Sequence, residues 1–276
     1  MTSSAHALAD VFAAEGGGGE GGFQSPTIAE FYPPAVAEFS VLGIDFEITR
    51  ITIIMWIATA AILTLLVLAA RKASVVPDKL QYIGESGYSL VRDGMARDVI
   101  GPKGLPFAPF LASLFFFILA NNFMSIVPFA QISPNSRFAF PLILAIIVWV
   151  LYNYIGIREQ GAARYFKDAA IPPGVPIGAL ILVTPIELLQ VFVIRPFTLA
   201  VRLFANMFAG HMLLVVFSLG AVYLLTAGGI MPIFGVASFL MALVMTFFEL
   251  LVIVLQAYVF VVLTATYLNG AVEPAH

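Results

Sequence analysis

The chain has 276 residues, of which 61% are hydrophobic and 11% are charged, with a net charge of -3. Soluble domains carry ~25% charged residues, so this composition excludes them and predicts a polytopic membrane protein. The lack of cysteine excludes disulfides and thiolate chemistry, and three scattered histidines do not form a metal-binding motif. No basic cluster or phosphate-binding glycine loop is present, so nucleic acid and phosphate-bearing cofactors are not expected.

Residues 1–47 are expected to form an N-terminal extension outside the cytoplasm, ahead of a membrane domain over residues 48–276. The extension contains no Lys or Arg, which argues against a secretory signal or an organelle transit peptide. Its glycine-rich piece at 15–22 predicts a flexible tail. The piece at 27–47, with two adjacent prolines, is expected to lie at a membrane surface.

Three hydrophobic segments over about 48–70, 107–127 and 138–157 are each long enough to cross a hydrocarbon core of ~30 Å. Residues 73–104 are mixed in character and predict an amphipathic helix on the cytoplasmic membrane surface. Asn121 and Asn122 lie inside the second span, where amide side chains need polar partners. We expect them to make interhelical hydrogen bonds.

The last two hydrophobic segments, about 176–226 and 232–268, are too long for an upright helix. As helices they would measure ~75 Å and ~55 Å, against a core of ~30 Å. Either Pro185 or Pro196 breaks the first segment, or it runs steeply tilted; the second contains no internal break and is expected to tilt. The short connection predicts an antiparallel hairpin over about 176–270. The expected fold is therefore all-α, with about five membrane helices.

Basic residues predict the orientation of these helices. Residues 71–103 contain six Lys and Arg and residues 158–167 contain three, whereas the opposite side has only Arg50 and Arg137. Because Lys and Arg concentrate in cytoplasmic loops, the N-terminus is expected outside and the C-terminus in the cytoplasm.

Arg202 is the most informative residue of the chain. Between residues 169 and 269 the sequence has four charged residues: Glu187, Arg195, Arg202 and Glu249. A guanidinium keeps its proton at any workable pH, and placing one at membrane depth costs between ~3 and ~17 kcal/mol. We therefore expect Arg202 to be functional.

Helical spacing groups other polar residues around this arginine. Asn206 lies four residues after Arg202 and shares its face, and Glu249 and Gln256 lie seven apart on one face of the last helix. An antiparallel register places Arg202 level with Gln256, and His211 level with Glu249. Histidine has a reference pKa near ~6.5, so a His–Glu pair can pass protons near neutral pH, whereas Arg202 cannot. A relay that ends at a permanent cation is what a half-channel would require.

Each of these polar residues could instead have a purely structural role. Asn206 and Gln256 could simply join helices, and His211 could be a buried core histidine. Glu187 could be an ion-pair partner of Arg202, although it is ~22 Å away along a straight helix. Arg195 could extend its side chain to the membrane interface.

Two segments of the chain resemble one known family. Residues 196–211 read PFTLAVRLFANMFAGH, and residues 249–268 read ELLVIVLQAYVFVVLTATYL. Together and in this order they resemble the two motifs of subunit a of the F-type ATP synthase. The resemblance is strong over 176–270, and over 48–170 mainly the layout of spans agrees.

The resemblance implies a stator subunit beside a rotating ring of c subunits, each of which carries one carboxylate. Arg202 matches the arginine that attracts each ring carboxylate and prevents proton leakage between two half-channels. His211, Glu249, Asn206 and Gln256 match positions of the outer half-channel and of the arginine's surroundings. Several bacterial relatives place the acid and the histidine of the first pair the other way round.

The family often has an acid near Glu187, on the cytoplasmic approach to the arginine, but here the spacing to Pro196 is one residue longer. The implied protein is not an enzyme by itself and needs no cofactor or metal. Its implied partners are the c-ring, b-type subunits of the peripheral stalk and the lipid bilayer, in the plasma membrane of a bacterium. Its implied substrate is H⁺, since a His–Glu relay has no use for sodium.

The alternative is an ion-coupled secondary transporter. Such a protein needs a substrate site at mid-depth and usually has an internal repeat, and the sequence shows neither.

Overall fold

The computed structural model describes residues 31, 34–41, 44–71, 77–128, 130–171 and 177–272. In this part of the chain, five helical segments are long and apolar enough to span a membrane: Arg50–Arg71, Pro102–Phe123, Ala139–Gln160, Gly178–Thr226 and Met231–Val272. They confirm the predicted all-α membrane class and all five predicted spans. The glycine-rich piece at 15–22, expected to be a flexible tail, lies outside the described residues.

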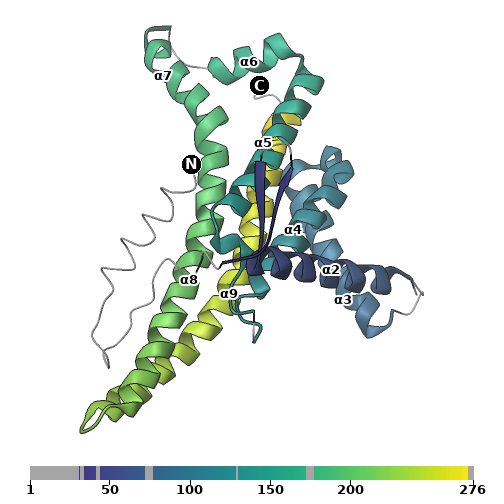
Figure 1. Ribbon diagram of the computed structural model, residues 1–276. Helices are drawn as coiled ribbons and strands as arrows, with labels where there is room; N and C mark the ends of the chain where they lie inside the picture. The colour runs from purple at the N-terminus through teal and green to yellow at the C-terminus, as the bar shows by residue number, and fades with distance from the viewer. Residues whose placement is uncertain are drawn as a thin grey trace.

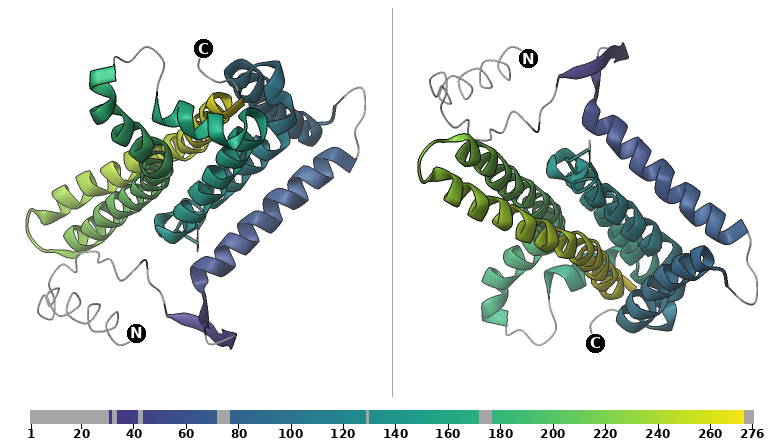
Figure 2. Two further views of the ribbon diagram at one scale, coloured as in Figure 1. Left: turned by 90° about the horizontal axis from the view of Figure 1, so that it is seen from above. Right: turned by 90° about the horizontal axis from the view of Figure 1, so that it is seen from below.

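The first half of the membrane domain combines regular α-helices with short π-helical and 3-10 pieces. In chain order these are α2 (Arg50–Arg71), α3 (Lys79–Val91), the π-helix η2 (Arg92–Ile100), the 3-10 helix η3 (Pro102–Phe107) and α4 (Ala108–Phe123). α2 packs against α3 and α4 and lies apart from the final hairpin in both views of Figure 2. The predicted amphipathic helix corresponds to α3 and η2, and Leu80, Ile83 and Leu90 of α3 remain exposed, as a membrane-surface helix requires.

A β-hairpin precedes the first span, which the sequence analysis did not expect. Strand β1 (Ala35–Val41) pairs antiparallel with β2 (Ile44–Thr49), and β2 continues directly into α2. At this end of the molecule Arg50 donates a hydrogen bond to the carbonyl of Ala130, at 3.3 Å. The strands therefore belong to the part of the extension nearest the membrane domain.

The third span and the segments around it support the hairpin from one side. Helix α5 (Ala139–Gln160) packs against both α8 (Arg195–Thr226) and α9 (Met231–Val272). Helix α6 (Ala162–Ala170) follows α5 and leads toward α7 (Ile177–Leu189). A short 3-10 turn, η4 (Pro134–Ser136), lies between α4 and α5 and contacts α8. The buried apolar core is formed by α4, α5, η2, α8 and the second half of α9.

The two long terminal segments form the predicted antiparallel hairpin. The first consists of α7 (Ile177–Leu189), the π-helical η5 (Gln190–Ile194) and α8 (Arg195–Thr226), and the second is α9 (Met231–Val272). Neither Pro185 nor Pro196 ends the first rod, which remains helical for 49 residues or ~74 Å. Because a membrane core is ~30 Å thick, the rod must cross it obliquely. Figure 1 shows α8 and α9 side by side near their connection at the bottom of the view, and the two rods apart toward the top, where α7 lies.

Glycines allow the two rods to approach closely near their connection. A Cβ atom at Gly235 of α9 would lie 2.8 Å from the backbone nitrogen of Leu225, so a larger residue cannot fit there without a shift. Gly229 in the connection has a φ of +73°, a left-handed conformation that glycine adopts at little cost. These two positions explain why the reversal is both tight and close-packed.

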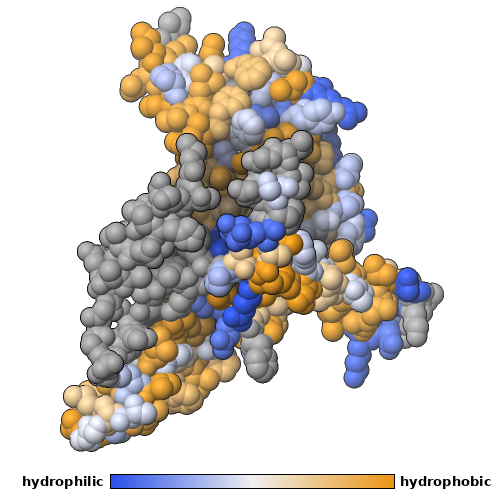
Figure 3. All heavy atoms as spheres, viewed as in Figure 1, coloured by the Kyte–Doolittle hydropathy of each residue, from blue (hydrophilic) through white to orange (hydrophobic). Residues whose placement is uncertain are grey.

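Large apolar side chains cover the outside of the hairpin. Figure 3 shows hydrophobic surface over the visible parts of α7 and of the hairpin. Exposed examples are Ile181, Leu182, Val222, Ile233 and Phe247. An aqueous surface would not tolerate this amount of apolar area, whereas lipid or a hydrophobic partner would cover it.

Candidate functional site

Arg202 lies on α8 with an exposed side chain. Within the described part of the chain, no hydrogen bond or salt bridge reaches its guanidinium. The alternative of a permanent ion pair with Glu187 is not seen: Glu187 is half-buried on α7, and no salt bridge joins the two among the described residues. Arg202 is therefore a fixed positive charge that an external anion can approach.

Contacts across the hairpin give its register at the depth of the polar residues. Asn206 Nδ2 of α8 donates to Gln256 Oε1 of α9 at 2.5 Å. Further along, a Cβ atom at Gly210 would lie 3.6 Å from the carboxyl carbon of Glu249. Glu249 is thus level with the turn of α8 that carries His211, and Gln256 is level with the turn between Arg202 and Asn206. Within about one turn, this is the register that the sequence predicted.

The α9 partners of these contacts are buried but incompletely hydrogen-bonded. Glu249 is 2% exposed and Gln256 3% exposed. Among the described residues, neither carboxylate oxygen of Glu249 has a hydrogen-bond partner, and Gln256 Nε2 has none. Buried polar groups are usually paired with protein atoms or with ordered water, so these two side chains mark a polar position within the apolar hairpin.

A cluster of buried polar side chains extends from Glu249 into the loop after α4. Asn122 Oδ1 accepts from Asn135 Nδ2 at 2.7 Å and from Ser133 Oγ at 3.4 Å, and Ser125 Oγ donates to the Asn122 carbonyl at 2.9 Å. Ser125 also lies beside the carboxyl group of Glu249. The polar groups therefore continue from the hairpin to the loop end of the molecule.

No sequence pattern marks the loop part of this cluster, and Ser133 and Asn135 were not among the predicted site residues. Both asparagines of α4 were predicted to bond to other helices. Instead, Asn121 donates to the carbonyl of Phe117 on its own helix at 2.8 Å, and Asn122 bonds to the loop because the loop folds back over the end of α4.

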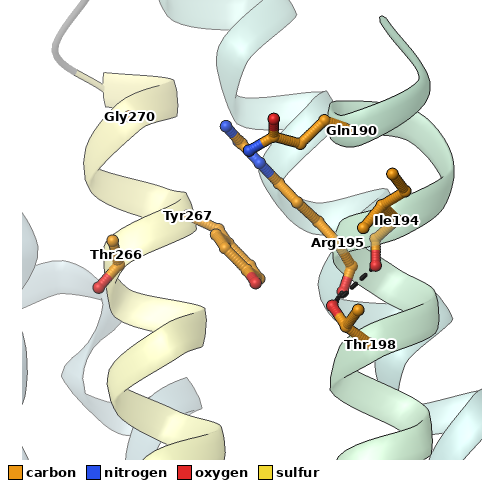
Figure 4. A pocket seen from close by; sticks show the side chains of 7 residues that line it. All are labelled: Gln190, Ile194, Arg195, Thr198, Thr266, Tyr267 and Gly270. Atoms are coloured by element: carbon orange, nitrogen blue, oxygen red, sulfur yellow. Dashed lines mark hydrogen bonds between the residues drawn. The ribbon is translucent and has the colours of Figure 1, made fainter. Parts of the chain in front are cut away.

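A second polar region lies at the other end of the hairpin, where a cavity of about 420 Å³ opens between the two rods. It is lined by Gln190, Ile194, Arg195, Thr198, Thr266, Tyr267 and Gly270. Figure 4 shows the residues of η5 and α8 on one wall and the α9 residues on the facing wall. Arg195 stacks over the ring of Tyr267, with 5.5 Å from its Cζ atom to the ring centroid. The arginine is thus held at this cavity, with an aromatic partner that the sequence analysis did not identify.

An irregular turn of helix positions Arg195 and connects this wall to α5. In the π-helical η5, the Arg195 N–H donates to the Gln190 carbonyl five residues back, which bypasses the Val191 carbonyl. Pro196, the next residue, has no N–H to offer. The hydroxyl of Tyr152 on α5 supplies the missing donor at 2.6 Å from Val191 O. The proline therefore shapes the rod without breaking it.

Glu187 does not line the cavity, although it lies one helical turn before Gln190. No group of three or more His, Cys, Asp or Glu side chains that could hold a metal ion occurs among the described residues. The polar groups thus form two separate regions along one hairpin, with Arg202 between them.

Comparison with known proteins identifies the family over most of the chain. The sequence model of the family described as "ATP synthase A chain" matches residues 52–269. The chain is 46% identical to the ATP synthase subunit a of Parafrankia sp. (strain EAN1pec), over 91% of this chain and 85% of the relative. It is 43% identical to the subunit a of Frankia alni, over 91% and 86%, and 40% identical to that of Rhodococcus erythropolis, over 91% of each.

The extent of these matches decides between the two functions that the sequence analysis considered. They run through all five spans and both polar regions, and relatives at this identity share their fold and general role. A secondary transporter is therefore no longer supported. The chain belongs to the ATP synthase subunit a family, and it is a non-catalytic, multi-pass membrane subunit of the proton-translocating F0 sector.

Proposed function

We propose that the chain forms two offset half-channels against a ring of carboxylate-bearing c subunits, with Arg202 as the barrier between them. The observation that carries this proposal is the exposed Arg202, which no polar group of the described residues neutralises. An internal carboxylate would compete with each incoming ring carboxylate. At 4 Å and an effective dielectric of about 20, one such pair is worth about 4 kcal/mol.

The outer half-channel follows the buried polar groups from the α4–α5 loop to the middle of the hairpin. His211 and Glu249 exchange the proton, because a neutral imidazole and a carboxylic acid can each give or accept one. Asn206 and Gln256, joined by their hydrogen bond, hold the two rods together next to Arg202. The burial of Glu249 on α9, beside Ser125 of the polar loop cluster, supports this assignment.

The inner half-channel starts at the cavity between Arg195 and Tyr267. Polar side chains line part of this cavity, which lies about two helical turns, or ~10.5 Å, before Arg202 on α8. Glu187 is proposed to lie on the approach to this cavity rather than in its wall. Arg202, which cannot release its proton, prevents a direct path between the two regions.

The basic residues of the loops support an orientation with the N-terminus outside and the C-terminus in the cytoplasm. In this orientation the α4–α5 loop faces outward and the cavity faces the cytoplasm. The proposed partners are the c-ring along the hairpin and b-type subunits of the peripheral stalk. The proposed location is the plasma membrane of a bacterium.

Replacement of Arg202 tests the central step. In inverted membrane vesicles that carry the whole complex, Arg202→Ala is expected to abolish ATP-driven acidification. Arg97→Ala is the matched control, because Arg97 is exposed and forms a salt bridge with Asp93, four residues before it on η2, and it should leave pumping intact. Native pumping by Arg202→Ala would refute the proposal.

Replacement of Glu249 tests the outer path separately. Glu249→Gln preserves size and hydrogen-bonding capacity but cannot carry a proton. We expect slower proton flux in a complex that still assembles with normal amounts of this subunit. An unchanged flux would remove Glu249 from the relay while leaving the role of Arg202 intact.

A further inference from the structure

An aromatic residue from the N-terminal extension lies directly against His211. The ring of Phe31 meets the imidazole edge-on, with centroids 5.1 Å apart and an interplanar angle of 78°. The same ring packs on Phe208 of α8 at 4.7 Å. Phe31 is 1% exposed and His211 is 6% exposed. A residue far away in the sequence therefore covers one face of the proposed proton carrier.

The backbone of Phe31 is anchored to the α4–α5 loop. Arg137 Nε donates to the Phe31 carbonyl at 2.6 Å, and Arg137 Nη1 donates to Thr49 Oγ1 at 3.3 Å. Hydrogen bonds from a charged donor are roughly twice as strong as neutral ones. One guanidinium thus ties together the extension, the end of β2 and the loop, and it keeps the Phe31 ring in place.

We propose that Phe31, held by Arg137, is a cap that closes the outer face of the half-channel over His211. A phenylalanine ring offers no donor or acceptor, so water cannot form a hydrogen-bonded chain through it to the imidazole. The backbone of Gln131 also lies beside His211, in the loop that carries the polar cluster, and it gives the imidazole a polar side. The cap therefore restricts proton entry to that polar side and excludes direct contact between His211 and the bulk.

The cap differs from ordinary core packing in what its removal does to water access. Ordinary packing predicts only a change in stability when the ring is removed. A cap predicts that a group at position 211 becomes accessible to a small water-soluble reagent. The purpose of the cap rests on the half-channel proposed above, but its existence can be tested without any proton transport.

The chain contains no cysteine, so one introduced cysteine is a unique reporter within it. In the purified complex in nanodiscs, where both faces are open, His211→Cys should react slowly with a charged methanethiosulfonate. Adding Phe31→Ala should raise the reaction rate about ten-fold or more, because the cap loses most of its buried apolar contact. Phe31→Leu, which keeps part of that contact, should give an intermediate rate.

Two reference variants define the scale. Ile230→Cys, in the exposed connection of the hairpin, reports the rate for an open site. Val36→Ala on β1, where the side chain is 66% exposed, is the matched change in the extension and should leave the rate at position 211 unchanged. An equal rate with and without the Phe31 ring would overturn the cap. So would a rate for His211→Cys alone that matches Ile230→Cys.

Crosslinking gives a second test that does not need Phe31→Ala to assemble. In a variant with Phe31→Cys and Phe208→Cys, a short bifunctional thiol reagent should join the two cysteines in the assembled complex. Failure to join them would overturn the cap. ATP-driven pumping by Phe31→Ala with His211 present is recorded separately. Faster labelling without any change in pumping would uphold the cap and count against His211 as a proton carrier.

Discussion

Tyr152→Phe tests whether one hydroxyl completes the hydrogen bonding of the α7–α8 junction. The Arg195 N–H bonds to Gln190, and Pro196 has no N–H, so neither supplies a donor to the Val191 carbonyl. The Tyr152 hydroxyl fills this gap at 2.6 Å. Both Tyr152 and Val191 are buried, so water does not replace the lost donor easily.

The expected cost follows from leaving a buried acceptor unpaired, which is about 1–3 kcal/mol. This corresponds to local opening of the junction that is about 5–150-fold more frequent. Hydrogen exchange of the amides around residues 190–195, followed by mass spectrometry on the purified complex, measures that opening. Tyr154→Phe is the matched control, because Tyr154 lies on the same helix with an exposed side chain, and its effect should stay below about 0.5 kcal/mol.

A double-mutant cycle makes the reasoning more specific. Pro196→Ala restores an N–H at the position where the π-helical spacing needs one for the Val191 carbonyl. In that background Tyr152→Phe should cost clearly less than in the native chain. The reasoning would be refuted if Tyr152→Phe exchanged as slowly as Tyr154→Phe, or if Pro196→Ala left the cost of Tyr152→Phe unchanged.

Three further predictions concern the hairpin. Gly235→Ala should disturb the closest approach of the rods and lower the amount of assembled subunit. Gly178→Ala is the control, because open space surrounds its Cβ position, and it should be neutral or stabilising by up to ~1 kcal/mol. The heat stability of the purified complex distinguishes the two variants. Asn206→Leu and Gln256→Leu should each lower the free energy of unfolding by about 1–3 kcal/mol, because each leaves its partner unpaired. The double variant should lose less than the sum of the two losses. Thermal denaturation measures these losses, and strict additivity would contradict the hydrogen bond. Tyr267→Phe should preserve ATP-driven pumping, because the ring beneath the Arg195 guanidinium remains. Tyr267→Leu removes that ring and should change the pumping rate. Equal pumping by the two variants would argue against a functional role for the stacking.

Helix lengths and spacings predicted the hairpin and its register well. A stretch of 49 helical residues cannot stand upright in a bilayer, and polar residues seven apart must share a helical face. Once the short connection makes the rods antiparallel, few alignments bring Glu249 near His211. The contact of Gly210 with Glu249 and the bond between Asn206 and Gln256 lie within one turn of that alignment.

Other parts of the site depend on contacts that no periodic pattern in the sequence predicts. The contact between Phe31 and His211 joins residues that are far apart in sequence, and no sequence pattern distinguishes Phe31 from the other phenylalanines. The β-hairpin before α2 consists of two short strands, and short alternating segments are weak signals. The donor role of Tyr152 follows only when the π-helical spacing before Pro196 is known, because an α-helical spacing would leave a different carbonyl free.

The unbroken helix α9 fixes the distance and the rotation between the two proposed proton paths. Glu249 of the proposed outer path and Tyr267 of the cavity at the proposed inner path lie on this helix, about 27 Å apart along its axis. Inserting one residue between them would turn one path by ~100° relative to the other, and no loop within α9 could absorb that rotation. This part of the chain should therefore accept many substitutions but no change in length.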